Sequence, residues 1–188
     1  LVKPKDYLFP MDIPRVMLVS PFVVGVPREE YYPFVKQDKS FVLEFLKMVR
    51  KNMSKKKYMV NRNRDEYLIH VLVLTLNNEL RNDVDVMLEA THIKPYTILV
   101  AGDTPRDNKK IMIYVVKDNG SLLEYASERL KKDKEIVFEA VKKYGLAYTF
   151  QYAHNDLKID KEFVKNLILK VSSIIFQYAH PYLKDNRY

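Results

Sequence analysis

Two adjacent segments decide the fold, because they repeat one pattern. Residues 133–159 read DKEIVFEAVKKYGLAYTFQYAHNDLKI, and residues 160–184 read DKEFVKNLILKVSSIIFQYAHPYLK. Both contain an opening Asp-Lys-Glu, an apolar pair directly after it and the block Phe-Gln-Tyr-Ala-His. Self-similarity at a period of about 25 residues is typical of repeat arrays, in which each unit buries its apolar face against its neighbours.

The same frame continues toward the N-terminus. Units that start at residues 83, 108, 133 and 160 are separated by 25, 25 and 27 residues. Before them, two segments with helical spacing flank a basic insertion at residues 50–64, which predicts a degenerate first unit. The predicted units lie near residues 38–82, 83–107, 108–132, 133–159 and 160–184.

Each unit has the same internal order. Asp or Asn opens it as a helix N-cap, and apolar residues follow at the third, fourth, seventh and eighth positions, on one helical face. Gly120 and Gly145 mark the helix end. A second short helix then carries a large apolar residue and, three positions later, an alanine, as in Phe150 and Ala153. The pattern predicts an all-α, right-handed solenoid of about five helical hairpins over residues 38–188.

Residues 1–37 differ from the rest of the chain in amino-acid composition. Six of the nine prolines fall within the first 33 residues, and proline removes a backbone donor and restricts the residue before it to extended geometry. We therefore predict an extended arm. Its apolar content exceeds that of a solvated linker, which indicates that it docks on a partner. The predicted docking residues are Met17, Leu18, Phe22, Val23 and Val24.

The positive charge of the chain is concentrated in residues 50–64. The formal net charge is +8, and this segment holds seven Lys and Arg residues without an acid. Like charges without local neutralisation indicate an acidic partner such as RNA, anionic lipid or an acidic protein face; the alternative is a passive, solvated turn. Tyr58 stands among the lysines, where a base could stack. The candidate polyanion-binding residues are Arg50, Lys51, Lys55, Lys56, Lys57, Tyr58, Arg62 and Arg64.

Composition argues against several classes of protein. The chain of 188 residues contains no Cys, which excludes disulfides, thiolate zinc sites and thiol nucleophiles. The chain has only four glycines, which argues against glycine-rich phosphate-binding loops. No apolar run approaches the roughly 20 residues that span a bilayer, so we expect no transmembrane segment. The chain begins with Leu1 rather than Met, so we expect a processed product or a part of a longer chain, and the compartment stays open.

Two repeated residue types invite chemical interpretations. His154 and His180 hold equivalent positions and would suggest a metal pair, but no third ligand repeats with them, so we expect them to fill the slot that Ser127 holds. Tyr125 and Tyr152 recur one residue before an alanine, and we expect them to lie between units rather than to stack on bases. The acids at unit starts are explained by capping. We predict no catalytic residue, no metal and no cofactor.

Two motifs resemble a known family. The pattern D-K-E-I-V-x-E-A-V-K-x-x-G at residues 133–145, preceded by L-x-Y-A-S-x-x-L-K-x-D at residues 123–133, is similar to the tandem repeats catalogued as domain of unknown function 4116. The resemblance extends over residues 108–184, is weaker over residues 83–107 and is absent before residue 38. It implies a helical repeat and no activity.

These observations predict a non-catalytic interaction or structural subunit that binds other protein subunits of an assembly. The alternative is a subunit that binds RNA or another polyanion through residues 50–64.

Overall fold

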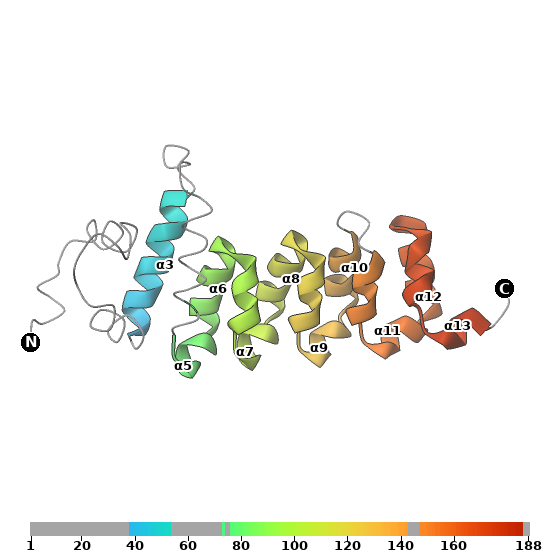
Figure 1. The fold of residues 1–188 in the computed structure, drawn as a ribbon, viewed down its shortest axis with the longest axis horizontal. Coiled ribbons are helices and arrows are strands. Elements are labelled where there is room, and N and C mark those ends of the chain that lie inside the picture. The colour runs from blue at the N-terminus through green and yellow to red at the C-terminus, as the bar shows by residue number, and fades with distance from the viewer. Residues whose placement is uncertain (1–37, 54–72, 74–75, 143–146, 186–188) are drawn as a thin grey trace, which may run out of the picture.

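The computed structural model describes residues 38–53, 73, 76–142 and 147–185, and every regular element within them is a helix. The prediction of an all-α fold is therefore confirmed for these residues. The longer helices stand side by side in chain order along the long axis of the molecule (Figure 1). They are α3 (Lys39–Met53), α6 (Val84–Ile93), α8 (Lys109–Asp118), α10 (Lys134–Lys142) and α12 (Lys161–Lys170).

Each unit after residue 83 contains three helices, where the sequence predicted two. A 3-10 helix follows each longer α-helix, and a short α-helix follows the 3-10 helix. The 3-10 helices are η3 (Pro95–Val100), η4 (Gly120–Tyr125), η6 (Ala147–Tyr152) and η7 (Ser173–Tyr178). The short α-helices are α7 (Asp103–Arg106), α9 (Glu128–Lys131), α11 (Asn155–Ile159) and α13 (Pro181–Asp185), and α5 (Asn78–Arg81) precedes them.

The repeated alanine explains why the second segment divides into two helices. The N–H of Ala153 donates to the carbonyl oxygen of Phe150 at 3.1 Å, the i to i+3 bond that ends a 3-10 helix. Ala126 makes the same bond to Leu123 and has extended backbone angles, φ −68° and ψ 153°. The spacing of three is therefore a 3-10 turn, and the alanine is the junction between two helices rather than a residue inside one.

The longer helices begin where the capping pattern predicted. The side chain of Asp83 accepts hydrogen bonds from the N–H groups of Asp85 and Val86, and Asp160 accepts one from Phe163. These bonds satisfy N–H groups that have no partner inside the helix. The helix start thereby fixes which positions face the core.

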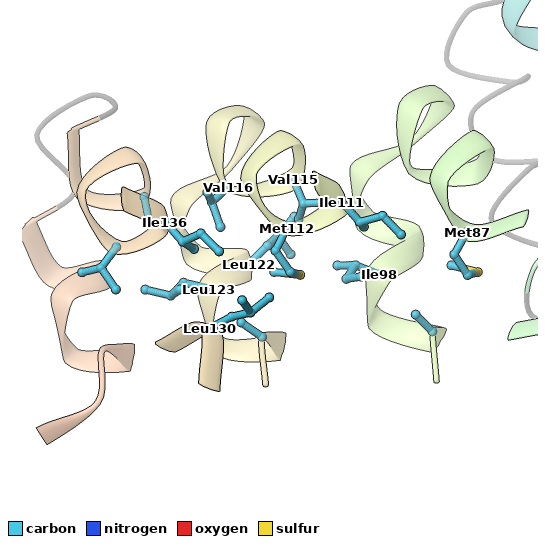
Figure 2. Close-up of a cluster of buried hydrophobic side chains, with 14 of the residues drawn as sticks. Met87, Ile98, Ile111, Met112, Val115, Val116, Leu122, Leu123, Leu130 and Ile136 are labelled. Atoms are coloured by element: carbon cyan, nitrogen blue, oxygen red, sulfur yellow. The ribbon is translucent and has the colours of Figure 1, made fainter. Parts of the chain in front are cut away.

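The core is continuous from one unit to the next. Side chains from successive units point toward one another in a single apolar layer (Figure 2). The layer includes Ile111 and Met112 of α8 and Leu123 of η4, and Ile136 of α10 extends it into the next unit. No unit could bury this surface alone, so the units stabilise one another.

Within the described residues, no helix combines the length and the apolar character that a bilayer-spanning segment requires.

Candidate interaction surfaces

A backbone hydrogen bond recurs at each junction between successive units. The residue that caps a short α-helix donates its N–H to a carbonyl oxygen of the short α-helix before it. The bonds join Gly102 to Arg81 at 2.8 Å, Ser127 to Arg106 at 3.1 Å, His154 to Lys131 at 3.0 Å and His180 to Lys158 at 3.1 Å. This ladder fixes each unit at one register on its predecessor.

Ion pairs lie at three of these junctions on the longer helices; at the fourth, α6 has Val84 and α8 has Asn108 at the two positions. Lys109 Nζ lies 2.7 Å from an Asp133 carboxylate oxygen and 2.8 Å from one of Glu135, and Lys134 Nζ lies 2.6 Å from Asp160. In each pair a lysine at the first position of one helix meets the acid that caps the next longer helix. Lys39 pairs with Asp83 in the same way, at 2.7 Å.

The pKa of Asp133 is lowered at this junction. Partial burial acts to raise it, but the hydrogen bond from Lys109 and the backbone N–H groups of Ile136 and Glu135 outweigh that effect. Exposed pairs of this kind contribute little to stability. The pairs nevertheless recur with the same arrangement. A lysine at the start of one longer helix faces the acid that caps the next longer helix.

One junction requires a glycine. A Cβ atom at Gly120 would overlap the backbone carbonyl of Ala140, because the start of η4 touches α10 directly. Glycine at this position therefore allows η4 to pack directly against α10 of the next unit.

Phe176 departs from the burial pattern of its equivalents. Ile98, Leu123 and Phe150 hold the same position, three residues before the junction alanine, and each is 0% exposed. Phe150 packs against Phe163 of the following unit, with ring centroids 6.4 Å apart. Phe176 belongs to the last described unit and is 43% exposed. It presents an apolar ring where the other units have a buried contact.

Leu169 lies at a second position of this kind. Its equivalent in the first complete unit is His92, whose ring centroid is 4.4 Å from that of Tyr114 in the next unit. Leu169 is 76% exposed. A fully apolar side chain therefore projects from α12 at a position that contacts a successor elsewhere in the array.

Ile174 lies at a third such position. Its equivalent Tyr96 accepts a hydrogen bond through its hydroxyl from Asn119 of the next unit, at 2.6 Å. Ile174 itself is 50% exposed. These three apolar side chains of the last unit form a surface that we call the trailing face: Leu169, Ile174 and Phe176.

The trailing face was not predicted from the sequence, although a signal was present. Leu169 stands where aligned units have Lys117 and Lys142, and Ile174 stands where they have Tyr96 and Tyr148. That signal is the presence of apolar residues, in the last described copy, at positions that are polar in the earlier copies.

The predicted polyanion-binding segment is only partly described. Arg50 and Lys51 occupy the last turn of α3 and are exposed. The other candidates lie outside the described residues: Lys55, Lys56, Lys57, Tyr58, Arg62 and Arg64. All five docking residues predicted in the arm also lie outside them: Met17, Leu18, Phe22, Val23 and Val24.

Arg50 takes part in packing between α3 and α6. Its Nε lies 3.2 Å from Oε2 of the buried Glu89, an ion pair that is not aligned as a hydrogen bond. Its guanidinium also lies 3.2 Å from Nδ1 of His92. Burial lowers the pKa of His92, and the positive charge of Arg50 lowers it further. Arg50 therefore balances a buried carboxylate.

The repeated histidines are helix caps. Nδ1 of His154 accepts a hydrogen bond from the Asp156 N–H at 3.1 Å, and Nδ1 of His180 accepts one from the Tyr182 N–H at 3.2 Å. Ser127 caps α9 in the same slot. Among the described residues, no group of three or more His, Cys, Asp or Glu side chains has a geometry that would hold a metal ion.

The recurring tyrosines are partly buried between units. Tyr125, Tyr152 and Tyr178 pack against the core, and the guanidinium carbon of Arg106 lies 5.7 Å from the ring centroid of Tyr125 in the next unit. Burial raises the pKa of Tyr152, and the negative charge of Glu124 contributes to the rise. These rings serve packing between units.

Comparison with known proteins supports the family resemblance. Residues 108–158 match the model of the family described as a domain of unknown function, DUF4116. The match starts at the cap of α8 and runs into α11, across two consecutive units. The curated proteins and the solved structures compared with the chain gave no match. The resemblance of this chain to the DUF4116 family is thus shown over residues 108–158.

Proposed function

We propose that this chain is a non-catalytic helical-repeat subunit that binds other proteins of a larger assembly. The observation that carries the proposal is the exposure of Phe176, whose equivalents Ile98, Leu123 and Phe150 are fully buried. The other two side chains of the trailing face, Leu169 and Ile174, are exposed on the same unit. Contiguous exposed apolar surface is a mark of protein interaction sites.

The proposal includes a particular architecture. Residues 38–188 form a right-handed solenoid of about five units, in which α3 and α5 belong to a degenerate first unit. Two contacts support that assignment. Lys39 meets Asp83 as Lys109 meets Asp133, and the carbonyl oxygen of Arg81 in α5 accepts the first bond of the junction ladder. Residues 1–37 act as an arm that docks on a neighbouring subunit.

Affinity isolation of the full chain from its source cells tests the function. Phe176→Asp should reduce co-purified partner proteins at least tenfold, because a charge would be buried in the interface. Ile159→Asp is the matched control, since Ile159 is 42% exposed but lies outside the trailing face. The proposal predicts that this variant retains the partners. Identical partner yields from both variants would contradict it.

A second candidate function is binding of RNA or another polyanion. It is favoured by the seven cations without an acid in residues 50–64 and by the position of Arg50 and Lys51 at the end of α3. Because Arg50 forms an ion pair with Glu89, we assign the proposed polyanion contacts to the basic residues that follow Arg50. The dependence of RNA affinity on salt concentration separates this function from the first.

A further inference from the structure

A cluster of three polar side chains holds the C-terminal end of α3 against α6, and the proposed function makes no use of it. Arg50 of α3 contacts both of the other members: its Nε lies 3.2 Å from Oε2 of Glu89, and its Nη1 lies 3.2 Å from Nδ1 of His92. Glu89 is buried, while the Arg50 side chain is 47% exposed. One cation at the surface therefore serves a buried carboxylate and an imidazole at once.

The contact between Arg50 and His92 requires a neutral imidazole. A guanidinium group has only donors, so Nδ1 of His92 must be the acceptor and carry no proton. A proton on Nδ1 would remove the acceptor and place a second positive charge 3.2 Å from the guanidinium nitrogen. The arrangement in the structure is therefore specific to the neutral form of His92.

Charged and aromatic groups from three helices face the His92 ring. The cations Arg50 of α3 and Lys110 of α8 oppose its protonation, and Glu89 of α6 favours it. Tyr114 of α8 makes a T-shaped contact with the ring, with centroids 4.4 Å apart, and its hydroxyl donates to the His92 carbonyl oxygen at 3.2 Å. Burial first, and then the two cations, lower the pKa of His92 from its ordinary value of 6.5. His92 is therefore neutral at about pH 7 in the folded chain and takes up a proton at a lower pH.

Protonated His92 has an acidic neighbour on its own helix. Glu89 precedes it by three residues, a spacing that places two side chains on the same face of a helix. The imidazolium carries the same charge as the Arg50 guanidinium, so it can balance the buried Glu89 carboxylate in place of Arg50. This exchange avoids the cost of leaving a buried carboxylate without a cation.

We infer that His92 and Arg50 form an acid-sensitive latch between α6 and α3. While His92 is neutral, Arg50 binds His92 and Glu89 together. When His92 takes up a proton, it becomes the cation beside Glu89, and the Arg50 side chain is released into solvent. Arg50 is the first cation of residues 50–64, so its release adds a positive charge to that basic segment. The latch is independent of the trailing face and of the function proposed above.

NMR relaxation of the full chain tests the latch, because it reports how firmly a side-chain N–H group is held. A titration of the His92 imidazole signal first gives the pH at which this residue takes up its proton. The order parameter of the Arg50 Nε–H group is then measured about one pH unit above and about one pH unit below that midpoint. We expect the order parameter to fall below about 0.6, the range of flexible groups, only at the lower pH.

Two controls accompany the measurement. The guanidinium of Arg106 is held by carbonyl oxygens, which do not titrate: those of Ile98 at 3.4 Å and Leu99 at 2.8 Å. The order parameter of its Nε–H group should therefore be the same at both pH values. His92→Asn keeps an acceptor, because its amide oxygen takes the place of Nδ1, but it takes up no proton. Arg50 should stay ordered at both pH values in this variant, and His92→Gln serves the same purpose if His92→Asn does not fold.

Three results would overturn the inference. The first is an Arg50 side chain that is as ordered when His92 is protonated as when it is neutral. The second is an equal loss of order in the parent and in a His92 variant, which would assign the release to another titrating group. The third is a His92 ring that takes up no proton while the chain remains folded. None of these results would change the loss of partners expected for Phe176→Asp, so the latch and the proposed function fail separately.

Discussion

The backbone N–H of His154 donates to the carbonyl oxygen of Lys131 at 3.0 Å and so joins α11 to α9 across a unit junction. The equivalent donors elsewhere are Gly102, Ser127 and His180. Because the bond uses only backbone atoms, the side chain at this position can vary between units. The side chain has a separate local task, which is to cap its own helix, and histidine performs it through Nδ1.

Close approach at Gly120 predicts a stability effect. Gly120→Ala should lower the free energy of unfolding by about 1–3 kcal/mol, because the new methyl group meets the backbone of Ala140, which cannot move without shifting α10. Urea unfolding followed by circular dichroism measures this loss. Gly102→Ala is the comparison: its methyl group would meet side-chain atoms of Asn82, with Cβ at 2.9 Å, rather than a helix carbonyl, so we expect a smaller loss. Equal losses would show that η4 and α10 are not in tight contact.

The position of Arg50 predicts that its side chain stabilises the folded chain. Arg50→Ala should destabilise the chain by about 1–3 kcal/mol, because it leaves the buried Glu89 carboxylate without its cation. Lys51→Ala removes the same charge one residue later from an exposed position and should cost less. Thermal unfolding of the two variants gives the comparison. If Lys51→Ala is as destabilising as Arg50→Ala, the pair between α3 and α6 has no special role.

Junction ion pairs predict a dependence of stability on pH. The hydrogen bond from Lys134 and the backbone N–H of Phe163 lower the pKa of Asp160 below its ordinary value of 3.8. A lowered pKa contributes stability that is present above 3.8 and is lost as the pH falls through the lowered value. Asp160→Asn keeps a capping side chain but removes the charge. Between about pH 6 and about pH 2, its melting temperature should therefore fall less than that of the parent. Parallel curves would contradict the ion pair.

A salt titration separates RNA binding from the scaffold function. If residues 55–57, Arg62 and Arg64 each neutralise one phosphate of single-stranded RNA, log affinity should fall against log salt with a slope of about −3 to −4. Replacing residues 55–57 by Ala should remove about two units of that slope. Tyr58→Ala should weaken binding by about 1–3 kcal/mol and leave the slope nearly unchanged. Equal binding by the triple-Ala variant and the parent would exclude this function.

Much of the fold could be predicted from sequence because caps and apolar spacing are local signals. The helix starts at Asp83 and Asp160 follow from residue type and period alone. The 3-10 helices could not be distinguished in the same way: a spacing of three between Phe150 and Ala153 suits one face of an α-helix and a 3-10 turn equally, and the bond between those residues decides it.

The candidate site was harder to predict because burial depends on the neighbouring unit. Phe176 and Phe150 stand in identical Phe-Gln-Tyr-Ala-His blocks, so nothing local distinguishes them. They differ in that one ring has Phe163 against it and the other belongs to the last described unit. Composition did find the basic segment, yet it could not show that Arg50 at its start is bound to Glu89.

The alkylation rate of a Phe176→Cys thiol in the native assembly shows whether a partner covers the trailing face. The tagged variant is expressed in its source cells and alkylated in gentle extracts and again after purification as an isolated chain, with Ile159→Cys as the reference. We expect the Phe176→Cys thiol to react at least tenfold more slowly in the assembly than in the isolated chain, and the Ile159→Cys thiol to react at similar rates in both. Equal rates for the Phe176→Cys thiol in the assembly and in the isolated chain would contradict the claim that a partner covers the trailing face.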